Sequence, residues 1–341
     1  MNVRIQVKNI TPLCQIEGNR EERFDFLSNE KNKNPKVDTT TVKTMTILHE
    51  GIPVDVPIYT ANGFRGLLRR VIGAEIIAKA LEKGINVNTT NFHLMMAGGG
   101  SNYQAQPFEI EEQVRELNPL ISVFGTSLAI EGKLMVTHLV PEEALIRIKE
   151  EEDDTIRAYS QLLKRFVFIK KDDIIQKTKY GRLLSKEDII NWENEVEKSQ
   201  KQRKEEREIG EKTTKKKTVQ SILAKYYVIP NTEFKGFIGN KYPLTDIEEG
   251  MLIKGLSKIV KEQLGSTLNL GFGVCDWEIN IGENGSKIVA KSKDDNIFYK
   301  DISLILSDED ELKVEKYNEW LENLKAENIQ LDKILKASKK D

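Results

Sequence analysis

The sequence predicts an α+β protein with a ferredoxin-like (RRM-like) fold, an antiparallel sheet backed by two helices. Three observations lead to this prediction. Patterns typical of strand, helix and strand occur twice along the chain. The two sets are separated by residues 170–218, where charges of both signs are dense and apolar residues sparse, which indicates a large insertion. A last amphipathic helix follows the second set.

The first half begins with a predicted strand, because residues 2–10 alternate charged and apolar side chains. Residues 17–41 are polar and rich in turn formers, so we expect a long mobile loop there. Residues 42–48 and 52–59 predict the two strands of a hairpin.

A long helix is expected next. Asn62 is the expected N-cap, apolar residues recur at helical spacing, and Gly84 is expected to end the helix. Residues 95–107 predict a glycine loop, and a strand is expected from Lys133 to Val140.

The second half starts at residues 225–239, which predict a strand pair or one bent strand. Thr245 and Glu248 form a capping-box pattern that opens a helix reaching Gln263. Residues 268–281 predict a glycine-punctuated strand, and a final helix is expected over 307–337. The expected segments are therefore 1–169, 170–218, 219–290 and 291–341.

Composition restricts the classes of protein that fit. The chain has 341 residues, 39% of them hydrophobic, and no apolar run long enough for a transmembrane helix. The N-terminus lacks the apolar core of a signal peptide, so we expect a cytoplasmic protein away from membranes. Cys14 and Cys275 predict buried, reduced thiols, and we expect neither a metal nor a cofactor. A net charge of −2 means that any nucleic-acid site is local.

The start of the long helix is the first candidate binding site. Asn62, Arg65 and Arg69 share a helix face opposite the apolar stripe, and no acidic residue lies nearby in the sequence. Guanidinium groups beside a helix N-terminus suit a phosphate. Arg70 lies about 100° further around the helix and suits an ion pair as well. The alternative is a basic face that is merely solvated.

Two glycine-containing loops are further candidates, because backbone N–H groups in such loops can surround a phosphate. The first lacks the lysine and spacing of a nucleotide-hydrolysing loop and is equally consistent with a flexible loop. The second is equally consistent with a strand bulge. The candidate residues are Gly98, Gly99, Ser101 and Asn102 in the first loop, and Gly271, Phe272 and Gly273 in the second.

Aromatic and basic residues alternate at Lys164, Arg165, Phe166 and Phe168. This pattern suits base stacking combined with phosphate contact. The alternative is that both phenylalanines belong to a core.

The histidines predict no metal site, since His49, His93 and His138 are far apart in the sequence. One of them is a candidate general base for a metal-independent ribonuclease. Asp38, in the expected loop, is a candidate for positioning RNA for cleavage. Ordinary structural or solvent-exposed roles are the alternative for all four.

Four segments in a fixed order resemble a known family. They read IPVDVPIYTANGFRGLLRR, SVFGTSLAIEGKLMVTHLVP, YYVIPNTEFKGFIG and LNLGFGVCDWEI. Together they resemble the RAMP superfamily, and in particular the crRNA-binding backbone subunit of class 1 CRISPR effectors, the seventh Cas family. The type IV subunit is nearest, followed by type I. Asn231 stands where the family usually has glycine, and the last segment lacks an adjacent arginine or lysine.

The resemblance implies a palm, a thumb formed by the insertion over 170–218, and a non-catalytic role. Copies would stack head to tail on crRNA as a helical filament and present the guide to target DNA or RNA, together with other effector subunits.

Two alternatives remain open. The protein could be a RAMP endoribonuclease that processes precursor crRNA or cleaves target RNA, which the lack of basic residues in the last loop disfavours. It could also be an assembly protein that never contacts RNA.

Overall fold

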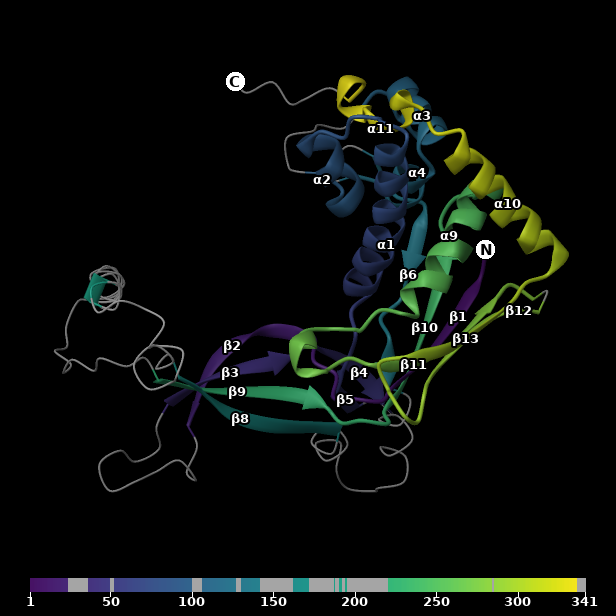
Figure 1. The fold of residues 1–341 in the computed structure, drawn as a ribbon. Coiled ribbons are helices and arrows are strands. Elements are labelled where there is room, and N and C mark those ends of the chain that lie inside the picture. The colour runs from purple at the N-terminus through teal and green to yellow at the C-terminus, as the bar shows by residue number, and fades with distance from the viewer. Residues whose placement is uncertain are drawn as a thin grey trace, which may run out of the picture. The chain divides into compact units, whose positions relative to one another are not determined.

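A computed structural model describes residues 1–23, 36–49, 52–99, 106–126, 130–141, 162–171, 220–283 and 285–335, and positions 187, 190, 191 and 194. The chain divides into two units. The larger unit comprises Met1–Glu17, Val42–Lys164 and Tyr227–Asp341, and the smaller one Gly18–Thr41 and Arg165–Tyr226. Figure 1 labels the elements of both units.

The larger unit contains a seven-stranded antiparallel sheet in the order β13-β12-β11-β1-β10-β6, with β7 also paired to β10. Its centre, β11-β1-β10-β6, is the strand order of a ferredoxin-like fold, with α1 the first of four described helices between β1 and β6, and α9 between β10 and β11. The predicted α+β fold class is confirmed. The strands are β1 (Val3–Asn9), β6 (Leu134–Val136), β7 (Val140–Pro141), β10 (Glu233–Asn240), β11 (Cys275–Ile281), β12 (Ser286–Ser292) and β13 (Lys300–Ile305).

The two connecting helices, α1 (Ala61–Glu82) and α9 (Asp246–Ile259), pack side by side against the sheet (Figure 1). Phe64 of α1 contacts Trp277 of β11, with ring centroids 6.2 Å apart. Gly255 of α9 leaves room for Ile72, where a Cβ would come within 2.5 Å of that side chain. The remaining helices of this unit are α2 (Thr89–Ala97), α3 (Phe108–Leu117), α4 (Pro119–Phe124), α10 (Asp308–Glu322) and α11 (Ala326–Ile329), with short 3-10 turns η3 (Leu268–Leu270) and η4 (Leu331–Lys333).

Helix boundaries follow the capping side chains. The prediction of Asn62 as the N-cap of α1 is wrong, because Thr60 occupies that position and its hydroxyl accepts the Gly63 N–H at 3.1 Å. The capping box of Thr245 and Glu248 is confirmed. The cap of α10 is Ser307, as expected, but the single helix predicted over 307–337 is wrong, since α10 ends at Glu322 and short turns follow.

Strand predictions had mixed outcomes. The hairpin is confirmed as β4 (Thr44–His49) and β5 (Ile52–Pro57). The loop predicted over 17–41 is wrong where strands form, at β2 (Ile16–Arg23) and β3 (Lys36–Val42).

The turn before β10 adopts the backbone conformation that its family-like pattern requires. Asn231 has a φ of 65°, the left-handed conformation for which glycine is usual and asparagine is tolerated. Buried Asn9 fixes this turn, since its side chain accepts the Thr232 N–H at 2.9 Å and donates to the Ile229 carbonyl.

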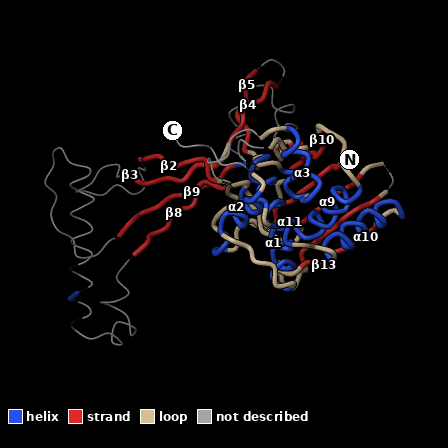
Figure 2. The backbone as a smooth tube through the Cα atoms, turned by 90° about the horizontal axis from the view of Figure 1, so that it is seen from above, coloured by secondary structure: helices blue, strands red, loops and turns tan. Residues whose placement is uncertain are grey.

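The smaller unit contains a four-stranded sheet in the order β2-β3-β9-β8, with β8 (Leu163–Lys171) and β9 (Gln220–Val228) (Figure 2). β3 and β9 are parallel. Val37, Ala224 and Val167 form a small apolar cluster on one face. Most of the predicted insertion over 170–218 lies outside the described residues.

Across the described part of the chain, no helix is both long enough and apolar enough to cross a membrane.

Candidate nucleic-acid interface

The arginines at the start of α1 contact the C-terminal ends of two neighbouring helices. The Arg69 guanidinium donates to the carbonyls of Met95 and Gly125, both at 2.8 Å, and to that of Leu94. Arg65 donates to the carbonyl of Phe124. These acceptors lie in the last turns of α2 and α4, or directly after them, where helix carbonyls lack intrahelical partners.

The prediction that Arg69 lies on a solvent-exposed phosphate-binding face is therefore wrong. Arg69 is only 7% exposed. Burial, together with nearby Arg65, lowers the pKa of the Arg69 guanidinium to about 10, so it remains charged near neutral pH. Arg65 is half-buried, and burial also lowers its pKa. Both cations complement helix C-terminal dipoles and backbone carbonyls instead of an external anion.

Asn62 and Arg70 remain exposed at the same helix start. Among the described residues, Arg70 has no hydrogen-bond or ion-pair partner, and its guanidinium folds back over Gly66, where a Cβ would lie 3.3 Å from Nη1. At Gly63 the close neighbour is the Gln15 side chain. Arg70 is the arginine of this helix start that is available to a ligand.

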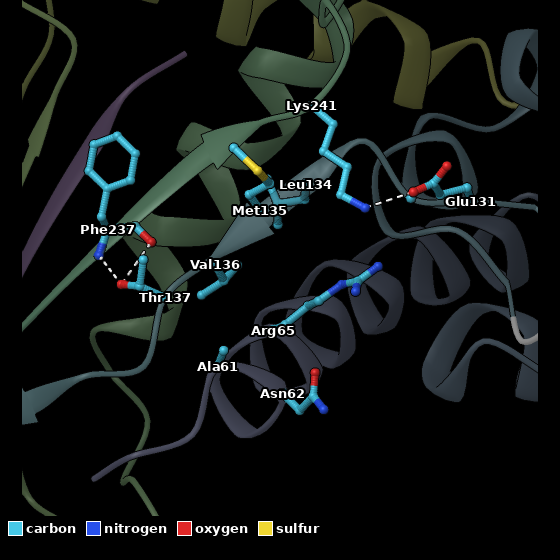
Figure 3. A pocket seen from close by; sticks show the side chains of 11 residues that line it. Ala61, Asn62, Arg65, Glu131, Leu134, Met135, Val136, Thr137, Phe237 and Lys241 are labelled. Atoms are coloured by element: carbon cyan, nitrogen blue, oxygen red, sulfur yellow. Dashed lines mark hydrogen bonds and ion pairs between the residues drawn. The ribbon is translucent and has the colours of Figure 1, made fainter. Parts of the chain in front are cut away.

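A pocket of about 440 Å³ opens between the start of α1 and β6. Figure 3 shows Asn62 and Arg65 on the α1 side, opposite residues 134–137. Lys241 closes one end through an ion pair of 2.7 Å with Glu131. Leu134, Met135, Val136 and Phe237 make much of the remaining wall apolar.

The glycine N–H groups proposed as phosphate ligands are used within the protein. Gly98 and Gly99 donate to the carbonyls of Leu94 and His93 and so end α2, with φ values of 88° and 82°. Gly271 donates to Leu268, and Gly273 to Pro12. The predicted phosphate cradle is wrong for these four glycines, while Ser101 and Asn102 lie outside the described residues.

The second loop also differs from the strand predicted over 268–281. It forms the 3-10 turn η3 before β11 begins at Cys275. Phe272 lies 5.8 Å from Tyr227, centroid to centroid, in an edge-to-face contact.

The aromatic and basic pattern of β8 forms a surface. Phe166 and Phe168 stack on each other with ring centroids 5.0 Å apart, and the Lys225 ammonium lies 5.9 Å from the Phe168 centroid. Val167, between the two phenylalanines, belongs to the apolar cluster, as does Ala224 beside Lys225. Alternation therefore places the phenylalanines on the face opposite that core. Both rings are partly exposed, and Lys164 and Arg165 are exposed.

Phe166 and Phe168 therefore do not belong to the apolar cluster of Val37, Ala224 and Val167. We name Phe166, Phe168 and Lys225 the basic–aromatic face. Lys225 was missed in the sequence, although alternation around the buried Ala224 was a usable signal.

The larger sheet has a second exposed surface that sequence reasoning missed, on the face away from α1 and α9. Strand register places Arg4 of β1 between Phe237 of β10 and Asn280 of β11, with Lys287 of β12 next. Arg4 is exposed and Phe237 partly exposed. This row itself holds no acidic residue, but Lys287 forms an ion pair of 2.7 Å with Glu278 of the neighbouring row.

The candidate nuclease residues are not assembled into a site among the described residues. His138 accepts the Ala61 N–H through Nδ1 at 2.9 Å, which helps to cap α1. Asp38 lies in β3, so its placement in a loop was wrong, and the His49 side chain is outside the described set. In the described part of the chain, no group of His, Cys, Asp and Glu is arranged to hold a metal ion.

No family model and no curated protein matches this chain. Among solved structures, a chain of one titled "Type IV-B CRISPR Complex" is similar, with 15% sequence identity and a TM-score of 0.45 over 83% of this chain and 92% of that chain. The similarity is too distant to carry an argument about function, which has to come from the residues of this chain.

Proposed function

We propose that this protein is a non-catalytic, crRNA-binding backbone subunit of a class 1 CRISPR effector complex. It binds single-stranded RNA without reading its sequence, and copies assemble head to tail along the RNA. Guide specificity then comes from base pairing between the RNA and target DNA or RNA. Its other partners are the remaining effector subunits.

The observation that carries the RNA-binding proposal is the basic–aromatic face. Stacked aromatic rings offer a surface on which any base stacks, since every base has a π-face. Lys225 beside Phe168 supplies positive charge on this face, which a phosphate backbone requires, whereas alternation puts Arg165 on the opposite face with Val167.

Two further observations support the assignment to a backbone subunit. The four family-like segments lie in the larger unit at the positions that build its ferredoxin-like centre, including the left-handed turn at Asn231. The acid-free row of Arg4, Phe237, Asn280 and Lys287 gives this sheet an exposed arginine beside an aromatic ring. Sheets of this fold commonly bind RNA in that way.

The double variant Phe166→Ala with Phe168→Ala tests the proposal. The rings face away from the apolar cluster, so we expect the fold to persist, while RNA affinity falls about 10- to 100-fold because each stacked base contributes about 1–3 kcal/mol. Titration of labelled single-stranded RNA, with a melting curve beside it, measures both quantities.

Phe108→Ala is the matched control, since Phe108 is 68% exposed on α3 and outside the basic–aromatic face. It should bind RNA like the wild type. Equal affinity of the double variant and the control would show that this face does not bind RNA. Cleavage of the bound RNA by the wild-type protein would contradict the non-catalytic role.

A further inference from the structure

The seven-stranded sheet ends at β13 on one side and at β6 with β7 on the other. Tyr59 bridges Leu139 on the second edge, and residues 134–136 have no further strand partner among the described residues. We propose that β13 of one copy pairs antiparallel with β6 of the next, so that the sheets of successive copies form one continuous sheet. This deepens the proposed head-to-tail assembly by naming its contact, and it rests on that proposal.

The C-terminal part of β13 has the properties of an unprotected edge strand. Lys300 and Asp301 place charges at its start, but its six residues contain no proline, and Ile302, Leu304 and Ile305 are 36%, 48% and 58% exposed. Natural edge strands are usually shielded by charges, prolines or bulges, because unpaired backbone groups recruit other strands. Phe298 and Tyr299, directly before β13, are also exposed.

The directions of the strands favour a head-to-tail contact. The path from β13 to β6 contains six strands, and every neighbouring pair along it is antiparallel. The two edges therefore run in opposite directions. When two copies lie in the same orientation, β13 of one meets β6 of the other as an antiparallel pair, which continues the pattern of the sheet.

Backbone hydrogen bonding indicates which residues are free to pair. Thr137 donates to Phe237, and Lys241 donates to Lys133, so alternation directs the backbone groups of Leu134 and Val136 away from β10.

The same reasoning applies to β13. Lys293 donates to Tyr299, so the N–H and C=O groups of Ile302 and Leu304 point away from β12.

Side chains agree with this register. Ile302 and Leu304 pair with Ala290 and Ile288, so they lie on the sheet face that carries α1 and α9. Val136 pairs with Ile238 and lies on that face too, as does Leu134. The register Ile302 to Val136 and Leu304 to Leu134 therefore joins free backbone groups and places apolar side chains together. The pocket beside β6 has room for them.

Charges of both signs meet at one end of the pairing. In this antiparallel register the C-terminal end of β13 lies beside the N-terminal end of β6. Exposed Asp308 and Glu311, at the start of α10, follow β13. The pocket at β6 holds Lys241, which is ion-paired with Glu131, and Arg65, which donates to the Phe124 carbonyl, so backbone pairing and apolar contact carry the interaction. The contact is small, so binding of neighbouring copies to one RNA raises their effective concentration and strengthens it.

Disulfide trapping tests the register. Ser303 and Met135 would form the non-hydrogen-bonded pair between the two proposed contacts, a geometry in which Cα atoms lie about 4.5 Å apart and a disulfide fits. Both native cysteines are fully buried, so background is low. We expect the variant carrying Ser303→Cys and Met135→Cys to give a ladder of cross-linked oligomers under mild oxidation. The ladder should form without RNA when the protein concentration is high, and it should be stronger when long RNA is present.

Single-cysteine variants distinguish head-to-tail pairing of β13 with β6 from symmetric pairing of two β13 strands. A mixture of Ser303→Cys protein with Met135→Cys protein should give only a dimer. A dimer from Ser303→Cys alone would show symmetric pairing of two β13 strands and overturn the proposal. The control is the variant carrying Ser303→Cys and Lys8→Cys, since Lys8 lies on the central strand β1, away from both edges. If the Ser303→Cys, Met135→Cys variant forms no more cross-linked oligomers than this control, the proposal is overturned.

A proline edge variant separates this inference from RNA binding. Leu304→Pro removes the outward-pointing N–H that would bond to β6 of the next copy and leaves the bonds to β12 in place, so the ladder of the double-cysteine protein should weaken by at least about tenfold. Its affinity for a short RNA that spans one copy should not change. An unweakened ladder would contradict the edge contact. If the Phe166→Ala, Phe168→Ala changes abolish RNA binding but leave the ladder of the double-cysteine protein intact, the result bears on the RNA-binding role of the basic–aromatic face and not on the edge contact.

Discussion

The start of α1 and the basic–aromatic face contain similar residue types, but they use them differently. At α1, Arg65 and Arg69 lie next to the C-terminal ends of α2 and α4 and donate to their carbonyls. On β8 and β9, the core cluster occupies one face of the sheet, and Phe166, Phe168 and Lys225 lie on the other. The comparison shows that similar residue types serve as donors to helix ends at one site and form an aromatic and basic sheet face at the other.

The largest expected effect is on stability, at Arg69. Replacement of Arg69 by alanine leaves the carbonyls of Leu94, Met95 and Gly125 without their buried donor, and unsatisfied buried groups cost about 1–3 kcal/mol each. Because Gly98 still donates to Leu94 and water partly replaces the guanidinium, we expect a loss of about 3 kcal/mol and a Tm lower by roughly 6–10 °C. Thermal unfolding measures the change in Tm. An unchanged Tm would show that these carbonyls do not need Arg69, and the proposed difference between the start of α1 and the basic–aromatic face would fail.

A smaller effect on stability is expected at the N-cap of α1. Thr60→Ala removes the hydroxyl that accepts from Gly63 and should cost about 1 kcal/mol, while Asn62→Ala should stay within about 0.5 kcal/mol because that side chain is exposed and caps nothing. Chemical denaturation of both variants compares them directly. A larger loss in Asn62→Ala than in Thr60→Ala would contradict the observed helix start.

The smallest effect is expected in RNA binding, at Arg70. Because its guanidinium has no partner among the described residues, Arg70→Ala should leave the Tm unchanged. If Arg70 contacts one phosphate, affinity falls about threefold, and the slope of log K against log salt becomes shallower by about 0.7. Titrations at two salt concentrations measure the slope. Lys83→Ala, at the far end of α1, is the control, and an equal slope in both variants would assign α1 no phosphate contact.

The sequence correctly predicted elements that depend on interactions between residues close together in the chain. The capping box at Thr245 and Glu248 and the hairpin of β4 and β5 were both predicted and found. Each depends on residues close together in the chain, so its physical cause is visible in the sequence.

Predictions failed where partners came from distant segments. Polar residues 16–23 and 36–42 form strands because they pair within the four-stranded sheet, where β3 lies next to β9. The glycines at 98 and 99 looked like a phosphate cradle, but their N–H groups end α2, a helix that the sequence analysis did not predict. Context of this kind overrides local propensity.

The sequence by itself determined the α+β class of the larger unit, the capping box of α9 and the hairpin of β4 and β5. Only the tertiary structure decided which charged groups remain available. Helical spacing placed Arg65, Arg69 and Arg70 near one another, but the positions of α2 and α4 buried Arg69 and left Arg70 exposed. The physical reason is that a guanidinium binds whichever acceptors lie within its reach, and helix ends distant in sequence supply acceptors that no local pattern records.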